Sequence, residues 1–272
     1  MADSPLWTAE ELVQASGGRM DGVITQPLNG IGIDNRTIAP GDIFVAIRGE
    51  NHDGHSFAAA ALKAGAGVAI VSRPTDEMRA AGPLLIVRDD PLKALERIGV
   101  ASRARSHGRI IGVTGSVGKT STKEMLRVAL SASGLTHASA ASFNNHWGVP
   151  LTLARMRRET AFGVFEIGMN HAGEITPLTA MVRPHVAIVT TIAASHLGHF
   201  KSLDEIADAK AEIFSGVEKG GHAIINRDTP HFERLAAAAR AAGVTNIIGF
   251  GRHEKSDVRL ERVVLHPSCC CI

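Results

Sequence analysis

The sequence predicts an α/β protein with parallel sheets, built from a small N-terminal unit and a larger second unit. Short apolar segments alternate with helix-like segments along most of the chain, a pattern typical of parallel sheets covered by helices. A glycine-rich turn joins one apolar segment to the next helix, as in phosphate-binding loops. The 272 residues suffice for two modest domains, and 44% apolar and 21% charged residues are ordinary for a globular protein.

The first unit is expected over residues 1–87. Thr8 as N-cap, with Glu11 three residues later, forms a capping box and predicts a helix over 8–16. An alanine-rich segment predicts a second helix over 56–64. Strands are expected over 42–47, 67–72 and 84–87.

The second unit is expected over residues 88–272. Asp90 followed by Pro91 gives an N-cap and a proline at the first helical position, which predicts a helix to about residue 105. Partial alternation after residue 252 predicts the start of a strand whose partners are missing. Strands are expected over 110–114, 163–168, 186–192, 223–226 and 246–250, and helices over 119–131, 147–156, 174–181, 203–216 and 230–242.

Composition excludes several classes of protein. Net charge is +2, from 29 basic and 27 acidic residues, so we expect no nucleic-acid partner. The first residues carry acids and no long apolar core, and no apolar run could span a membrane, so we expect a cytoplasmic protein without membrane insertion. The three cysteines are consecutive, at Cys269–Cys271, and predict no disulfide framework.

The run TGSVGKT at 114–120 is the strongest functional signal. Its glycines allow backbone N–H groups to approach phosphates, and the helix that follows adds partial positive charge. Lys119 could reach the β- and γ-phosphates of a nucleotide, and the Thr120 hydroxyl could ligate Mg²⁺. The general pattern requires glycine where this chain has Val113, so the loop is a variant. The candidate nucleotide contacts are Thr114, Gly115, Ser116, Gly118, Lys119, Thr120 and Ser121.

Glu166 lies inside an apolar strand, where an ionised carboxylate is costly unless it is paired or bound to metal. It could face the phosphate loop and bind Mg²⁺; the alternative is a solvated face of an edge strand. His196 and His199 follow the next strand, but their spacing and surroundings do not suit zinc. We favour simple solvation for His199 and leave solvation and a Mg²⁺ or phosphate contact equally open for His196.

Lys210 falls on the apolar face of the helix expected over 203–216, four residues after Ile206 and three before Ile213. A desolvated lysine has a lowered pKa and becomes a nucleophilic amine that can add CO₂ to form a carbamate. The pattern alone favours the other interpretation, a lysine at the edge of the stripe whose ammonium reaches water.

Several polar loops are ambiguous. Asn144 and Asn145 stand before a helix and could cap it or hydrogen-bond a polar substrate, with capping as the default. Asn226 ends a strand, where turn geometry and a nucleotide contact are both reasonable. The loops around Asn35 and Arg36, and from Glu50 through Asn51 to His52, indicate only turns when considered alone.

Four stretches together resemble the Mur ligases, ATP-dependent enzymes that form amide bonds in peptidoglycan precursors. The N-terminal segment at 34–49 and the DGH that follows also resemble their UDP-binding domain, so the resemblance extends over nearly all of the chain. The four stretches are TGSVGKTSTK at 114–123, NNHWGVPLT at 144–152, FEIGMNHAGE at 165–174 and AKAEIFSG at 209–216.

The resemblance implies a UDP-binding domain over 1–87 and an ATP-binding central domain over 88–272. It implies phosphate and Mg²⁺ binding by Lys119 and Thr120, and metal ligation by Glu166 and His196. Lys210 matches the lysine that the family carbamylates and would also serve the metal, which reverses the interpretation from the pattern alone. Lys119, Lys210 and His196 are the implied catalytic residues. Asn226 matches a nucleotide contact. The region that binds the uridine diphosphate is matched by Asn35, Arg36, Glu50, Asn51 and His52. The UDP-sugar peptide would be approached by Asn144 and Asn145.

The implied reaction joins D-alanyl-D-alanine to UDP-N-acetylmuramoyl-tripeptide through an acyl phosphate, with ATP and Mg²⁺, in a monomer. The family's C-terminal domain has no counterpart here, and the central domain stops early, so we expect this chain alone to be inactive. One alternative is a non-catalytic protein that binds nucleotide or UDP-sugar; another is a related ligase that adds a single amino acid. Similarity to the UDP domain argues against a folylpolyglutamate-type ligase.

Overall fold

The computed structural model describes residues 4–49, 51–140, 143–194, 198, 200–265 and 270–271. The chain folds into two compact units. One short segment in the middle of the second unit's sequence belongs to the first unit. The first unit continues past residue 87, where we expected a boundary, and takes in a short segment from the middle of the chain. The units are Met1–His107 with Pro150–Glu159, and Gly108–Val149 with Thr160–Ile272.

The first unit contains a five-stranded sheet in the order β1-β5-β4-β3-β2. Neighbours from β2 to β5 are parallel, and β1 is antiparallel to β5. A core of alanine, valine and leucine side chains with Phe44 joins α2 to β3 and β4. The elements are α1 (Ala9–Ser16), β1 (Arg19–Asp21), β2 (Gly30–Gly32), the 3₁₀ helix η1 (Asn35–Thr37), β3 (Asp42–Val45), α2 (His55–Lys63), β4 (Val68–Val71), α3 (Asp76–Ala81), β5 (Leu84–Ile86) and α4 (Pro91–Ala104).

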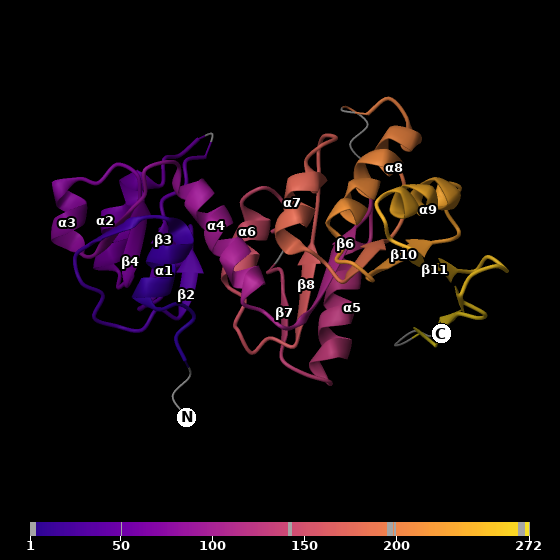
Figure 1. Ribbon diagram of the computed structural model, residues 1–272, viewed down its shortest axis with the longest axis horizontal. Coiled ribbons are helices and arrows are strands. Elements are labelled where there is room, and N and C mark those ends of the chain that lie inside the picture. The colour runs from indigo at the N-terminus through magenta and orange to yellow at the C-terminus, as the bar shows by residue number, and fades with distance from the viewer. Residues whose placement is uncertain are drawn as a thin grey trace. The chain divides into compact units, whose positions relative to one another are not determined.

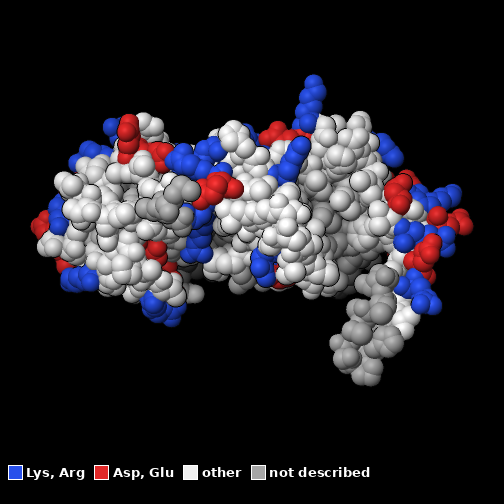
Figure 2. All heavy atoms as spheres, turned by 90° about the horizontal axis from the view of Figure 1, so that it is seen from below, with Lys and Arg blue, Asp and Glu red and all other residues white. Residues whose placement is uncertain are grey.

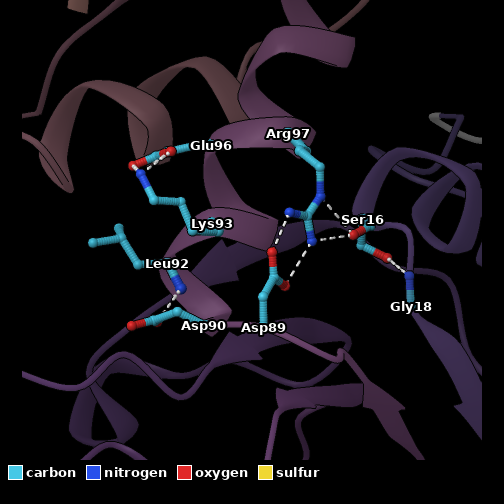
Figure 3. A network of polar contacts seen from close by, with 8 residues as sticks. All are labelled: Ser16, Gly18, Asp89, Asp90, Leu92, Lys93, Glu96 and Arg97. Carbon is cyan, nitrogen blue, oxygen red and sulfur yellow. Dashed lines mark hydrogen bonds and ion pairs between the residues drawn. The ribbon is translucent and has the colours of Figure 1, made fainter. Parts of the chain in front are cut away.

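Polar contacts hold α4 to the end of α1 (Figure 3). Arg97 donates from Nε and Nη2 to the Ser16 carbonyl, at 2.8 and 2.6 Å, and pairs with Asp89 at 2.6 Å. The Asp90 side chain accepts from the Leu92 N–H at 2.8 Å, which confirms the predicted N-cap. These contacts explain why α4 belongs to the first unit although it follows the expected boundary.

The second unit contains a seven-stranded sheet in the order β12-β11-β10-β9-β6-β8-β7. Every neighbouring pair in it is parallel, which confirms the predicted parallel sheet. The elements are β6 (Arg109–Thr114), α5 (Lys119–Ser131), β7 (Thr136–Ala138), α6 (Gly148–Ala154), β8 (Phe162–Glu166), α7 (Ile175–Val182), β9 (Val186–Val189), α8 (Leu203–Ala211), the 3₁₀ helix η2 (Glu212–Gly216), β10 (His222–Asn226), α9 (Phe232–Ala241), β11 (Asn246–Gly251), β12 (Val258–Arg259), and the pair β13 (Val264–Leu265) and β14 (Cys270–Cys271).

The strand order reverses direction at β6. The connection from β6 to β7 leads toward one edge of the sheet, whereas the connections from β7 onward lead toward β12 at the other edge. Right-handed crossovers then place α5, between β6 and β7, and α7, between β8 and β9, on opposite faces. Figure 1 shows α5 and α7 on opposite sides of β6 and β8. Ile111 and Val113 pack with α5 residues, whereas Gly112 faces Ile213 of η2. Ligands of such sheets bind at this reversal, which is where the glycine-rich loop lies.

The structure also differs from the expected elements. Elements β1, β2, β7 and α3 were not predicted, because three-residue strands of mixed burial lack an apolar run and α3 has only six residues. The helix expected over 203–216 divides into α8 and η2. Our expectation that the strand after residue 252 lacks partners is wrong, because Val258 pairs with Phe250 of β11.

Charge is mixed on the face of the described chain that Figure 2 shows, where lysine and arginine occur beside aspartate and glutamate. Within the described residues, no helix has both the length and the apolar character that crossing a membrane would require.

Candidate phosphate-binding site

The loop between β6 and α5 has the backbone geometry of a phosphate cradle. Gly115 and Gly118 adopt φ values of +146° and +84°, which residues with a side chain rarely adopt. Helix α5 begins at Lys119, and no side chain caps its N-terminus. Among the described residues, no side chain accepts from the first-turn N–H groups of α5, so these groups and the helix dipole face the loop.

The end of β9 fixes this loop from one side. Thr190 donates from its backbone to the Thr114 carbonyl at 3.0 Å and from Oγ1 to the Val117 carbonyl at 2.6 Å. Ser116 donates from its backbone to Thr191 at 2.9 Å and from Oγ to Ala193 at 3.0 Å. The loop is thus held in shape by the neighbouring strand.

Glu166, at the carboxyl end of β8, is buried at 1% exposure beside this loop. Thr120 Oγ1 donates to Glu166 Oε2 at 2.9 Å, and Asn144 Nδ2 donates to Oε1 at 2.7 Å. Strand β8 lies between β6 and β7, so the alternative of a solvated edge strand is wrong. A hydroxyl and a carboxylate are hard oxygen ligands that suit Mg²⁺, which takes one or two protein ligands together with phosphate and water.

Two lysines lie in the same electrostatic environment. Lys119 Nζ donates to the Gly115 carbonyl at 2.8 Å, and burial lowers the pKa of Lys119 while the Glu166 charge opposes that shift. Lys210 is only 1% exposed, and burial, with a smaller effect of the Lys119 charge, lowers the pKa of Lys210 to about 8. The interpretation of Lys210 as a lysine reaching water is therefore wrong. No hydrogen bond or ion pair engages its ammonium within the described chain.

The remaining loop candidates differ in their surroundings. Thr114 is fully buried, and its Oγ1 has no hydrogen-bond partner among the described residues, which is uncommon for a buried hydroxyl. Ser121 is exposed in the first turn of α5. His196 lies outside the described residues. Within the described ranges, no group of three or more histidine, cysteine, aspartate or glutamate side chains could hold a metal.

The candidate asparagines of the second unit, Asn144, Asn145 and Asn226, make internal contacts. Asn145 Oδ1 accepts from the Gly148 N–H at 2.9 Å, at the start of α6, as the capping interpretation predicted. Asn226 donates to the Thr190 carbonyl at 3.0 Å and accepts from the Asp228 N–H at 2.9 Å. Asn226 therefore supports the strand end that holds the phosphate loop.

Sequence reasoning missed two supporting side chains. Lys123 is fully buried in α5 and donates to the Ser139 carbonyl at 2.8 Å. Glu212 accepts from the Gly173 N–H at 2.6 Å and the Thr176 N–H at 3.0 Å, so it links η2 to the start of α7. Lys123 and Glu212 lie inside the stretches 114–123 and 209–216 that resemble the Mur ligases, but their hydrogen-bond partners are known only from the fold.

In the first unit, the candidate UDP contacts follow neighbouring strands. Asn35 and Arg36 come after β2, and Asn51 and His52 come after β3, which pairs with β2 in parallel. Arg36 is largely exposed and pairs with Asp34, and its hydrogen bonds lower the pKa of Asp34 to about 2. Glu50 lies outside the described residues.

A buried histidine steadies the second of these loops. Ser72 donates from its backbone to His55 Nε2 at 3.0 Å, so the proton of His55 is on Nδ1, which lies 2.7 Å from Asp53 Oδ1. Asp53 also accepts from Arg73. Burial opposes ionisation of Asp53, but these hydrogen bonds outweigh it and hold the pKa of Asp53 well below its usual range.

Comparison with known proteins agrees with this geometry. The chain is 42% identical over 222 residues to the UDP-N-acetylmuramoyl-tripeptide–D-alanyl-D-alanine ligase of Escherichia coli K12, a match covering 81% of this chain and 48% of that protein. A crystal structure of MurF from Acinetobacter baumannii has a TM-score of 0.84 at 36% identity, covering 97% of this chain and 57% of that one. The MurF ligase of Thermotoga maritima, solved in complex with ADP, has a TM-score of 0.73 at 25% identity, covering 89% and 54%.

The chain spans about half the length of the curated relatives that it matches. A model described as "Mur ligase family, catalytic domain" matches residues 27–103, and one described as "Mur ligase middle domain" matches residues 113–272. The second match alone takes in more than half of the chain, so together with the fold and the phosphate loop it shows that the chain belongs to the Mur ligase family.

Proposed function

We propose that this chain supplies the ATP- and UDP-substrate-binding parts of a ligase that joins D-alanyl-D-alanine to UDP-N-acetylmuramoyl-tripeptide. The relatives named for that reaction match both units of the chain. The observation that carries the proposal is the contact between Thr120 of the glycine-rich loop and the buried Glu166. It joins a phosphate cradle to a buried carboxylate, and a buried ionisable group beside such a loop favours a functional site.

The proposed reaction makes a poor electrophile reactive. ATP phosphorylates the terminal carboxylate of the tripeptide, and the amine of the dipeptide then attacks the acyl phosphate and expels phosphate. Lys119 would stabilise the negative charge that develops on the transferring phosphoryl group. Thr120 and Glu166 would hold Mg²⁺, which neutralises phosphate charge when bound.

Lys210 would act as a carbamate. Because the pKa of Lys210 is lowered to about 8, roughly one-tenth of its amine is neutral at pH 7. That amine attacks the carbon of CO₂, an N–C bond forms while one C–O π bond opens and its electron pair moves to an oxygen, and the nitrogen loses a proton to solvent. The carbamate would supply an oxygen ligand to the metal. Carbon-13 NMR after incubation with labelled bicarbonate should show a carbamate signal that Lys210→Met abolishes.

The first unit would bind the uridine diphosphate through the loops after β2 and β3. Arg36 is exposed and could exchange its pairing with Asp34 for a diphosphate oxygen. Asn35, Asn51 and His52 would contact the same ligand, and Asn145 the attached peptide. The protein would act as a monomer in the cytoplasm; analytical ultracentrifugation of the purified chain would test the monomeric state.

The main experiment measures nucleotide binding by the 272-residue chain with and without Mg²⁺. We expect calorimetry to show Mg²⁺-dependent binding of ADP that Lys119→Ala weakens about 10- to 100-fold, because a charge-assisted hydrogen bond is lost. Lys63→Ala, which removes an exposed lysine paired with Glu77, is the matched control. Equal ADP affinity for Lys119→Ala and the unmodified chain would contradict the proposal.

A further inference from the structure

The carboxylate of Glu166 receives one donor on each oxygen. Thr120 Oγ1 lies 2.9 Å from Oε2, and Asn144 Nδ2 lies 2.7 Å from Oε1. Two donors on opposite oxygens fix the rotation of the carboxylate plane, and each oxygen keeps a lone pair for a cation. The Thr120 hydroxyl belongs to the candidate cation site itself, whereas Asn144 contacts the carboxylate through its NH₂ group, which donates a hydrogen bond and cannot ligate a cation.

Asn144 is held in this pose by the chain that follows Glu166. The Gly168 N–H donates to the Asn144 carbonyl at 2.8 Å. A Cβ atom at Gly168 would lie 2.8 Å from both Cγ and Oδ1 of Asn144. Gly168 therefore leaves just enough room for this one side-chain position.

The backbone of Glu166 is anchored separately. Its N–H donates to Ser139 Oγ at 3.2 Å, and the Ser139 carbonyl accepts from the fully buried Lys123 at 2.8 Å. The main chain of Glu166 thus stays in place when Asn144 is changed. The amide of Asn144 acts on the carboxylate orientation alone.

We propose that Asn144 is a positioning residue that orients the Glu166 carboxylate for the divalent cation, rather than a contact to the UDP-linked peptide. This inference rests on the proposed function, because it requires that Glu166 binds the cation that accompanies the nucleotide. Groups that orient metal ligands affect metal affinity strongly, and their removal costs about 10- to 100-fold. The amide is already in contact with the ligand oxygen, so its effect should be of this size.

The first test titrates Mg²⁺ at a fixed ADP concentration into purified chain and measures the Mg²⁺ concentration at half-maximal binding. We expect Asn144→Ala to raise it about tenfold and to leave ADP affinity in EDTA unchanged. Asn144→Asp replaces the donor by a carboxylate of the same shape and should raise it as well. Asn246→Ala is the matched control, because the Asn246 amide donates to the Gly220 and Gly221 carbonyls at the start of β11, at the opposite end of the strands from the phosphate loop; it should leave the Mg²⁺ requirement unchanged.

A second variant tests positioning without touching either Glu166 or Asn144. In Gly168→Ala the added Cβ displaces the Asn144 amide, so the Mg²⁺ requirement should rise as in Asn144→Ala. In the double variant Asn144→Ala/Gly168→Ala the space is free, and no further rise is expected beyond either single change. Such non-additivity is the signature of one shared interaction.

Three results would overturn the inference. In the first, the unmodified chain binds Mg²⁺ and ADP together, and Asn144→Ala changes the Mg²⁺ requirement by less than about twofold. This result would contradict the inference and leave the proposed function standing. In the second, the rises in Mg²⁺ requirement caused by Asn144→Ala and Gly168→Ala add in the double variant, which would also contradict the inference and leave the proposed function standing. Absence of Mg²⁺-dependent ADP binding in the unmodified chain would overturn both the inference and the proposed function.

Discussion

At the scale of single residues, the site concentrates charge where water is excluded. Glu166 and Lys210 are each 1% exposed, and Lys119 couples electrostatically to both. Such burial disfavours the ionised forms unless partners compensate. Glu166 has compensation from two hydrogen-bond donors, whereas the described residues provide none for Lys210. The protonation of Lys210 should therefore affect folding.

Replacing Lys210 should change how stability depends on pH. In the unfolded chain Lys210 has its ordinary pKa of 10.5, and in the folded chain about 8. Between these values the unfolded state binds the extra proton, so the free energy of unfolding should rise with pH from 8 to 10.5. The full rise corresponds to about 3 kcal/mol. Lys210→Met should flatten it and should stabilise the protein at pH 7, as measured by urea unfolding in CO₂-free buffer.

The control for this experiment is Lys93→Met, which removes an exposed lysine paired with Glu96. It should leave the pH profile of the unmodified chain intact. A Lys210→Met profile that still rises by the same amount between pH 8 and 10.5 would show that other groups cause the rise.

Residue patterns predicted part of the site before the fold was known. A lone glutamate in an apolar strand indicated the buried Glu166, and helical spacing placed Lys210 on an apolar face, although the pattern could not decide whether its ammonium reaches water. The partners of Asn144 and Asn226 could not be predicted, because Glu166 and Thr190 lie 22 and 36 positions away. Only the sheet topology brings these groups together.

At the scale of elements, the phosphate loop depends on a close approach to β9. A Cβ atom at Gly115 would lie 1.9 Å from Thr190 Oγ1, and the φ of +146° disfavours any side chain. Gly115→Ala should therefore distort the loop and abolish ADP binding in calorimetry while the fold persists. Gly112→Ala, in the preceding strand with its nearest atom at 3.4 Å, is the control that should bind ADP normally. Normal binding by Gly115→Ala would mean that the loop does not need this approach.

Helix α7 is held by a carboxylate from a different element. Glu212, which lies in η2, accepts from the Gly173 N–H, the Thr176 N–H and the Thr176 hydroxyl. It therefore caps the N-terminus of α7 although it belongs to a different element. Glu212→Ala should lower the free energy of unfolding by about 0.5–2 kcal/mol, since the first turn of α7 loses the acceptor that caps it. Thermal unfolding should show this loss, whereas Glu77→Ala, at an exposed ion pair, should change stability by less than about 0.5 kcal/mol. Equal losses in both variants would contradict the capping role.

Element prediction succeeded where apolar runs or capping signals are strong. The capping box at Thr8 and the proline after Asp90 both mark real helix starts. Strand β7 was not predicted because its residues are half-buried. It lies at the edge of the sheet and pairs with one strand only, so it needs no apolar run. The break between α8 and η2 has no sequence signal that we identified.

At the scale of the whole molecule, the chain does not divide at a single boundary. After building β6, α5 and β7 of the second unit, it returns to the first unit over Pro150–Glu159 and then resumes the sheet with β8. No composition shift marks this return, so the sequence predicted one boundary at residue 87. The first unit is consequently completed by residues distant in sequence.

A fragment ending at residue 107 should therefore fail to fold stably. The segment 150–159 supplies the Ala154 carbonyl that accepts from the buried Trp7 indole at 2.9 Å, and the Met156 carbonyl that accepts from Ser102 at 3.2 Å. It also contributes the buried side chains of Leu153 and Met156. Burial of one such side chain is worth about 1.5–3 kcal/mol, against a total stability of about 5–15 kcal/mol for a domain.

The measurement compares residues 1–107 alone with the same fragment joined through a flexible linker to residues 150–159. Circular dichroism and urea titration should show a cooperative transition only in the joined form, and Trp7 fluorescence should report a buried indole only there. A third fragment carrying Leu153→Ala and Met156→Ala in the joined segment should fall between the two, because it keeps the backbone acceptors and loses the apolar contacts. Cooperative folding of residues 1–107 alone would show that the first unit is stable without residues 150–159.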